Sequence, residues 1–257
     1  MRAQPDGALL SSSSPIHVTA AAMTVHRASA VALYTGSARL WQDANVVSAP
    51  VIEFDRERRS VVARASSDRE LSNGGASDPG SALGSTDQAA SASASPGQSV
   101  STVLVQTDKS GKVTPVIVTA NRLTYADSER RAHFEGGVIA KSADFSVRAE
   151  QMEVFLEPRS QATSGAGQSL GGTARLNRIV ARNQVVVTQP TRRATGDQLV
   201  YTAGADKFVL TGGPPCIFDA EHGKITGISL TLFRTDDRVL VEGSDTSPSV
   251  SQTRVAR

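Results

Sequence analysis

A repeated strand-turn-strand pattern constrains this chain more than any other feature of its sequence. Residues 120–136 align with residues 196–212 at an offset of 76, and with residues 20–36 at an offset of 100. Each copy has a short apolar strand, a turn, a second strand and then a glycine, which is Gly136, Gly212 or Gly36. Repeats of this kind are typical of stacked units that bury their apolar faces against their neighbours.

Short strands separated by frequent turns are predicted throughout the foldable parts of the chain. Residues 179–187 are rich in β-branched side chains, and Leu123-Thr124-Tyr125 alternates apolar and polar residues. No long segment has apolar residues at helical spacing. We therefore expect an all-β fold, which could be a sandwich, a barrel or a solenoid-like stack of strands. The three repeated glycines are expected to mark bulges or bends.

Two segments lack the large apolar residues that a folded core requires. Residues 65–99 and 160–173 consist mainly of serine, alanine, glycine and other small or polar residues, so ordering them would cost more entropy than burial returns. We predict a disordered N-terminal tail at 1–15, a first strand unit at 16–64, a disordered insertion at 65–99, a main strand unit at 100–243 with a flexible loop at 160–173, and a disordered C-terminal tail at 244–257.

Equivalent positions of the copies carry apolar side chains on one face of each strand. Leu123 and Tyr125 match Leu199 and Tyr201, whereas Thr124 between them faces the other way. Repeated along a stack, one apolar face per strand gives a continuous apolar interior. From the residues alone, an interior filled by its own side chains is favoured over one that holds a ligand.

The repeat residues resemble those of a known family. The segments ATGDQLVY (194–201), KFVLTGGP (207–214) and VLVEG (239–243) are similar to repeats of the LptA/OstA-like lipopolysaccharide-transport family. Residues 119–137 have the same form, and residues 34–42 look like the corresponding early unit. The resemblance implies an open, twisted stack of antiparallel strands, a β-jellyroll folded like a taco. Members of that family hold lipopolysaccharide acyl chains between two sheets and pass the molecule to the outer membrane.

The resemblance implies a non-enzymatic periplasmic protein, with no catalytic residues, cofactor or metal. Its expected ligand is lipopolysaccharide. Its expected partners are jellyroll components at the inner and outer membranes, which would pair with its edge strands. The residues expected to line the lipid groove are Leu123, Tyr125, Phe134, Val138, Met152, Val154, Leu199, Tyr201, Leu210, Leu230 and Leu232.

Three features depart from the family pattern. Residues 1–15 contain no apolar stretch of the kind found in an export signal, so we interpret the chain as a fragment, as having a misplaced start, or as part of a longer fusion. The insertion at 65–99 is longer than a compact member needs. Pro214-Pro215-Cys216 interrupts the strand after Gly212, and we expect a sheet edge there.

Composition excludes several other classes. A single cysteine excludes an internal disulfide framework and a cysteine-based zinc site, and a net charge of +2 gives no sign of nucleic-acid binding. Two alternatives stay open: a structural or assembly module with a self-filled core and pairing edges, and a β-solenoid enzyme acting on polysaccharide. The enzyme would need clustered acidic and aromatic residues on an exposed face, whereas most of the 11 aromatic residues are predicted to point inward.

Overall fold

The computed structural model describes residues 10, 15–26, 29–42, 45–66, 98–107, 113–157, 176–220, 223–234, 238–244, 246 and 248–252. All regular secondary structure within these residues is β-strand, and neighbouring strands pair antiparallel, so the expected all-β fold is confirmed. The strands are β1 (His17–Thr19), β2 (Ala22–His26), β3 (Val31–Gln42), β4 (Asn45–Asp55), β5 (Ser60–Arg64), β6 (Val100–Thr107), β7 (Val113–Ala120), β8 (Arg122–Ala126), β9 (Arg131–Lys141), β10 (Ser146–Leu156), β11 (Leu176–Thr188), β12 (Arg192–Thr202), β13 (Lys207–Thr211), β14 (Cys216–Asp219), β15 (Gly223–Thr226), β16 (Ser229–Phe233), β17 (Val239–Glu242) and β18 (Val250–Gln252).

Four long strands, β3, β4, β9 and β12, change neighbours along their length. The strands β10 and β11 keep their neighbours but have register shifts at the same level, and together these features divide the sheet into two walls. In β12, for example, residues 198–202 pair with β13 whereas residues 192–195 pair with β14. Wall 1 consists of β2, 31–35, 51–55, β5, β8, 131–135, 151–156, 176–182, 198–202, β13, β16 and β17. Wall 2 consists of β1, 38–42, 45–49, β6, β7, 138–141, 146–149, 185–188, 192–196, β14, β15 and β18.

Three of the crossings between the walls lie at the repeated glycines. Gly36 and Gly136 have φ angles of +79° and +78°, and the β3–β4 and β9–β10 registers shift beside them. The third repeated glycine, Gly212, has φ of +75° and follows β13, just before the chain crosses to β14 in wall 2. A positive φ strongly favours glycine, so the repeat preserves these residues where the backbone must turn. The predicted bulges at Gly36 and Gly136 are confirmed.

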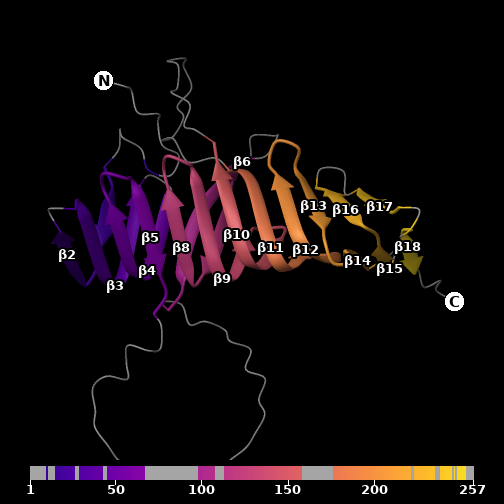
Figure 1. Cartoon of the computed structure of the whole chain (residues 1–257), viewed down its shortest axis with the longest axis horizontal. Coiled ribbons are helices and arrows are strands. Elements are labelled where there is room, and N and C mark those ends of the chain that lie inside the picture. The colour runs from indigo at the N-terminus through magenta and orange to yellow at the C-terminus, as the bar shows by residue number, and fades with distance from the viewer. Residues whose placement is uncertain are drawn as a thin grey trace, which may run out of the picture.

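The repeated strand units, each of which we call a layer, follow one another along a single long axis. Figure 1 shows the strands side by side, with β2 at one end and β17 and β18 at the other. Pairing of β5 with β8 and of β4 with β6 joins the first strand unit to the later strands without a break. On the side opposite the bends, the turns at 56–59, 127–130 and 203–206 end wall 1, and the turns at 142–145 and 189–191 end wall 2. We call the space between these two margins the mouth.

Three expectations about order and edges need correction. Residues Val250–Gln252 pair with β15, so this part of the expected C-terminal tail is ordered. Leu10, expected in a disordered tail, is buried against the core. Cys216 begins β14, which pairs with both β12 and β15, so no sheet edge lies there. The loop at 160–173 and most of the insertion at 65–99 lie outside the described residues.

Candidate functional site

The interior between the walls contains every residue that the sequence assigned to a groove. All eleven belong to one buried cluster, and their exposed fractions are 0–2%. Their alternation with outward residues follows the strand pattern, because successive side chains of a strand point to opposite faces. These residues are Leu123, Tyr125, Phe134, Val138, Met152, Val154, Leu199, Tyr201, Leu210, Leu230 and Leu232.

Ten of these eleven residues lie in wall 1, so the sequence-based prediction identified the lining of one side of the interior but only one residue of the other side. Only Val138 comes from wall 2. The opposite side is formed mainly by small aliphatic residues, among them Leu40, Val47, Val116, Val118, Ala140, Val147, Val185, Val187, Ala194 and Ile217. Alternation in the pairs Val116/Val118 and Val185/Val187 is the sequence signal that could have revealed this wall.

The first layer differs from its repeats in exposure. Met23 and Val25 occupy the positions of Leu123 and Tyr125, but they are 61% and 51% exposed. Among the described strands, β2 pairs only with β3, so no further layer covers them. Leu240 in β17 and Val250 in β18 are exposed at the other end of the stack. Both ends therefore present apolar side chains beside strands with one free edge.

A contact between the two walls closes the mouth near the C-terminal half of the stack. The guanidinium of Arg234, at the end of wall 1, lies 2.6 Å from the carboxylate of Asp144, in a turn of wall 2. Arg234 also lies over the ring of Phe145 at 5.0 Å and contacts Asp206 at 3.0 Å. The ring of Phe145 packs against Tyr201 and Phe208 of wall 1, with centroids 6.4 and 5.3 Å apart. We call this group the mouth clasp: Asp144, Phe145, Tyr201, Asp206, Phe208 and Arg234.

The polar groups of the clasp stabilise one another in their present ionisation states. Burial by itself lowers the pKa of the Arg234 guanidinium, but the charge of Asp206 and the bond to Asp144 raise it above its ordinary value. Burial and the neighbouring Asp206 carboxylate raise the pKa of Tyr201, whose hydroxyl donates to Asp206 at 2.9 Å. Arg234 therefore stays charged and Tyr201 stays neutral across the physiological range.

A second cluster of tyrosine, aspartate and arginine lies one repeat earlier, at the margin of wall 1. The hydroxyl of Tyr125 donates to Asp127 at 2.6 Å, and Arg59 pairs with the same carboxylate at 2.8 Å. Tyr125 is the repeat equivalent of Tyr201, so each tyrosine donates to an aspartate of the following turn, and an arginine of the adjacent layer pairs with that aspartate. Arg59 also donates to the carbonyl of Leu10, which holds this residue at the margin of wall 1.

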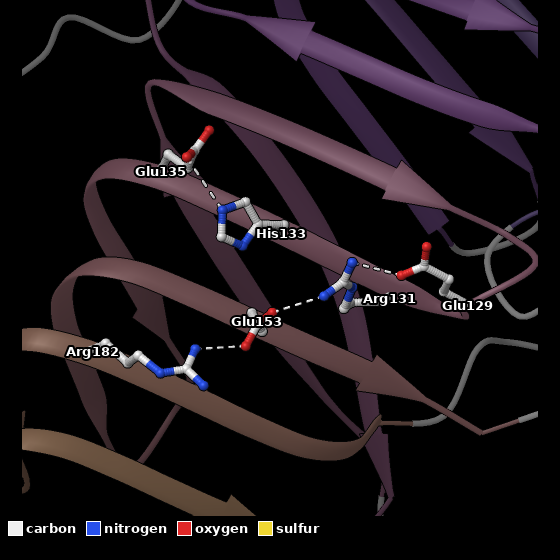
Figure 2. Close-up of polar contacts among 6 residues, drawn as sticks. All are labelled: Glu129, Arg131, His133, Glu135, Glu153 and Arg182. Atoms are coloured by element: carbon white, nitrogen blue, oxygen red, sulfur yellow. Dashed lines mark hydrogen bonds and ion pairs between the residues drawn. The ribbon is translucent and has the colours of Figure 1, made fainter.

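Charged pairs cover the outer face of wall 1. Figure 2 shows Glu153 of β10 between Arg131 of β9 and Arg182 of β11. The Glu153 carboxylate lies 3.0 Å from the Arg131 guanidinium and 2.6 Å from that of Arg182. Glu129 pairs with Arg131, and His133 lies 3.3 Å from Glu135. The hydrogen bond from Arg182 lowers the pKa of the Glu153 carboxyl against an opposing effect of burial. This cross-strand network stabilises the sheet and faces away from the interior.

The described residues offer no group of three histidine, cysteine or acidic side chains that could hold a metal ion. No helix long and apolar enough to cross a membrane occurs among them either. The two walls enclose an apolar interior. They are joined by the bends on one side and by the Asp144–Arg234 contact at the mouth.

These features define a class of protein, an open antiparallel β-jellyroll whose two walls enclose a continuous apolar interior. Residues 117–238 match the family model described as "LptA/(LptD N-terminal domain) LPS transport protein". The resemblance to the LptA/OstA-like family noted from the sequence is confirmed over these residues.

Comparison with individual proteins adds a structural neighbour. No curated protein matches the chain. A solved structure that resembles it is LptH from Pseudomonas aeruginosa, described as "the LptA homologous periplasmic component of the conserved lipopolysaccharide transport device". The identity is 10% and the TM-score 0.39, with 63% of this chain and 94% of that chain covered.

Proposed function

We propose that this chain is a periplasmic component of lipopolysaccharide transport that shelters lipid A acyl chains between walls 1 and 2 without catalysing a reaction. The observation that carries the proposal is the position of the family match. Residues 117–238 include all eleven predicted groove residues, and the family is one of lipopolysaccharide transport proteins.

The chemistry of the interior suits acyl chains. Both walls present mainly aliphatic side chains, and each methylene transferred from water to such surroundings gains about 0.8 kcal/mol. In the present structure the eleven residues are at most 2% exposed, so they have almost no surface for a ligand to contact. An acyl chain can reach them only when the walls separate. The Asp144–Arg234 contact across the mouth is polar and partly exposed, whereas continuous strands join the walls at the bends, so separation would occur at the mouth.

The two ends of the stack support binding to like domains. β2 and β17 end wall 1, and β1 and β18 end wall 2. Exposed Met23 at one end and Leu240 at the other would be buried if another jellyroll added its strands there. Components at the inner and outer membranes are the partners that this arrangement would accept.

The closed interior supports one other candidate function, a structural module whose core remains self-filled and whose edges alone bind partners. The two functions differ in what the interior contacts. A filled interior never meets lipid, whereas a transport interior does so whenever its walls separate.

Photo-crosslinking from adjacent positions distinguishes these functions. A photoreactive amino acid replaces Leu210, which points inward, or Val209, which points outward on the same strand. After illumination with lipopolysaccharide, the transport function predicts adducts at position 210 and few at 209. Repeating the experiment at Leu199 and Val200 guards against local misfolding. Folded proteins that form no adducts at either inward position would refute lipid binding and leave the structural module.

A further inference from the structure

The outer face of wall 2 has a different charge from that of wall 1. Among the described strand residues of wall 2, Asp219 is the only carboxylate, and it is paired with Arg192 and almost buried. Wall 1 carries several carboxylates, including Glu53, Glu135 and Glu153, each within 4 Å of an arginine. Among the residues that the structure describes, positive groups on the outside of wall 2 therefore lack the acidic partners that neutralise those on wall 1.

A hollow of about 290 Å³ opens on this outer face, where four strands lie side by side. Cross-strand partners place Ser146 beside Thr188, and Thr188 beside Arg193, in one row. In the next row Arg148 lies opposite both Ile139 and Val186. Partners in a sheet point to the same side, so the six side chains surround one space. The residues lining it are Ile139, Ser146, Arg148, Val186, Thr188 and Arg193.

The two arginines at this hollow differ in their contacts from the arginines on wall 1. Within the described residues, neither Arg148 nor Arg193 forms an ion pair or a side-chain hydrogen bond, in contrast to Arg131, Arg182 and Arg234. Lys141, which pairs with Ser146 across the strands, adds a third cation at the margin. A guanidinium presents several donors in a planar fork that matches phosphate oxygens, and serine and threonine hydroxyls add further donors.

We propose that this hollow binds a phosphate group, carried by a lipid headgroup or a sugar or free in solution. Arg148 and Arg193 would donate to its oxygens from opposite sides, and Ser146 and Thr188 would complete the donor set. Ile139 and Val186 form an apolar surface on which the carbon skeleton of a phosphate ester can lie. The site goes beyond the proposed transport function, because it lies outside wall 2. The interior on the other side of the same strands is formed by Val147 and Val187.

Nuclear magnetic resonance of the arginine side chains tests the site directly. The whole chain, labelled with nitrogen-15, is titrated with inorganic phosphate at constant ionic strength set by chloride. We expect saturable shifts of the Arg148 and Arg193 Nε–H signals. In Arg148→Gln/Arg193→Gln, affinity read from the remaining signals of the hollow should fall at least about tenfold. The control Arg56→Gln/Arg178→Gln removes the same charge from exposed positions of wall 1 and its turn, and should keep the wild-type affinity.

Linear, non-saturable shifts, or equal losses in both double variants, would overturn the proposal, because they would show only a general response to charge. Two further probes identify the source of the phosphate. Glucose 6-phosphate binding more tightly than inorganic phosphate would assign the site to a phosphorylated sugar. Co-sedimentation with phosphatidylglycerol vesicles but not phosphatidylcholine vesicles, lost in the Arg148/Arg193 variant, would assign it to a lipid headgroup. A site that binds inorganic phosphate but neither probe is one for free phosphate.

Discussion

Asp144 and Arg234 are 90 residues apart in the chain, yet their charged groups lie 2.6 Å apart and join the margins of the two walls. Arg234 also lies over the ring of Phe145, and that ring packs against Tyr201 and Phe208 of wall 1. The pair is therefore the polar contact that must break if the walls separate at the mouth. Its side chains are 56% and 15% exposed, so water can replace the bond when it breaks.

Replacing Arg234 should loosen the mouth more than it damages the core. Arg234→Ala removes the partner of Asp144 and Asp206 and the cation over Phe145, and we expect a loss of about 2 kcal/mol in the free energy of unfolding. Urea denaturation measures this loss. Exposed Arg56 provides the matched control, since Arg56→Ala should change stability by less than about 0.5 kcal/mol. Equal stabilities of the two variants would contradict a structural role for the clasp.

Replacing glycines by alanine should destabilise the protein to different extents, according to the φ angle and the space around each glycine. An alanine Cβ at Gly136 would lie 2.8 Å from the side chain of Asn121, at a φ of +78°, so Gly136→Ala should cost about 2 kcal/mol or more. Gly137 also has a positive φ but open space around it, so its alanine variant should cost about 1 kcal/mol. Gly204 has neither restriction, and Gly204→Ala should be nearly neutral. Thermal or urea unfolding that gave another order would refute this account of the bends.

The acidic limb of the stability profile should depend on Glu153. Its pKa in the folded protein is lowered below the ordinary 4.5, first by the hydrogen bond from Arg182. A carboxyl group whose pKa is lower in the folded than in the unfolded protein stabilises the fold fully at pH values above its unfolded-state pKa. This stabilisation is lost as the pH falls through its folded-state pKa. Glu153→Gln should therefore reduce stability at neutral pH and converge with the wild type as the pH falls below the lowered pKa of Glu153 in the folded protein. Urea midpoints measured across this range test it, with exposed Glu157→Gln as the control. Parallel profiles for wild type and Glu153→Gln would contradict it.

The single thiol should be unreactive while the protein is folded. Cys216 is 7% exposed, and burial raises its pKa, although Lys224 acts in the opposite direction. Because the thiolate is the reactive form, iodoacetamide should modify Cys216 far more slowly in the native protein than in urea. Mass spectrometry over time measures both rates, and similar rates would show that β14 opens readily.

The repeat predicted much of the fold because its spacing reflects the layer structure directly. The glycines at 36 and 136 and the inward set on wall 1 follow from alternation and offset alone. Wall 2 was largely missed, because its inward residues, such as Val185 and Val187, are small and lie outside the aligned copies. Met23 is exposed because it lies in the first layer. Its alignment with the buried Leu123 gives no information about that position at the end of the stack.

The clasp could not be predicted from sequence, for a physical reason. Phe145 lies in a turn between two strands, and its partners Tyr201 and Phe208 come from strands that meet it only after the sheet has bent.

The sheet edge predicted at Cys216 was wrong for another reason. The two prolines precede β14 rather than lying within it, so this strand pairs on both sides.

The central claim is that lipid enters between the walls, and the distance across the mouth tests it most directly. Spin labels are attached to cysteines at Ala143 and Gly204, exposed turn positions on opposite margins, in a Cys216→Ala background. Pulsed electron resonance then measures the distance between the labels with and without lipopolysaccharide. We predict a longer or broader distance distribution when lipopolysaccharide binds, and a smaller change in the Leu210→Arg variant, whose interior should reject acyl chains. An unchanged distance in protein that demonstrably holds lipopolysaccharide would contradict entry between the walls.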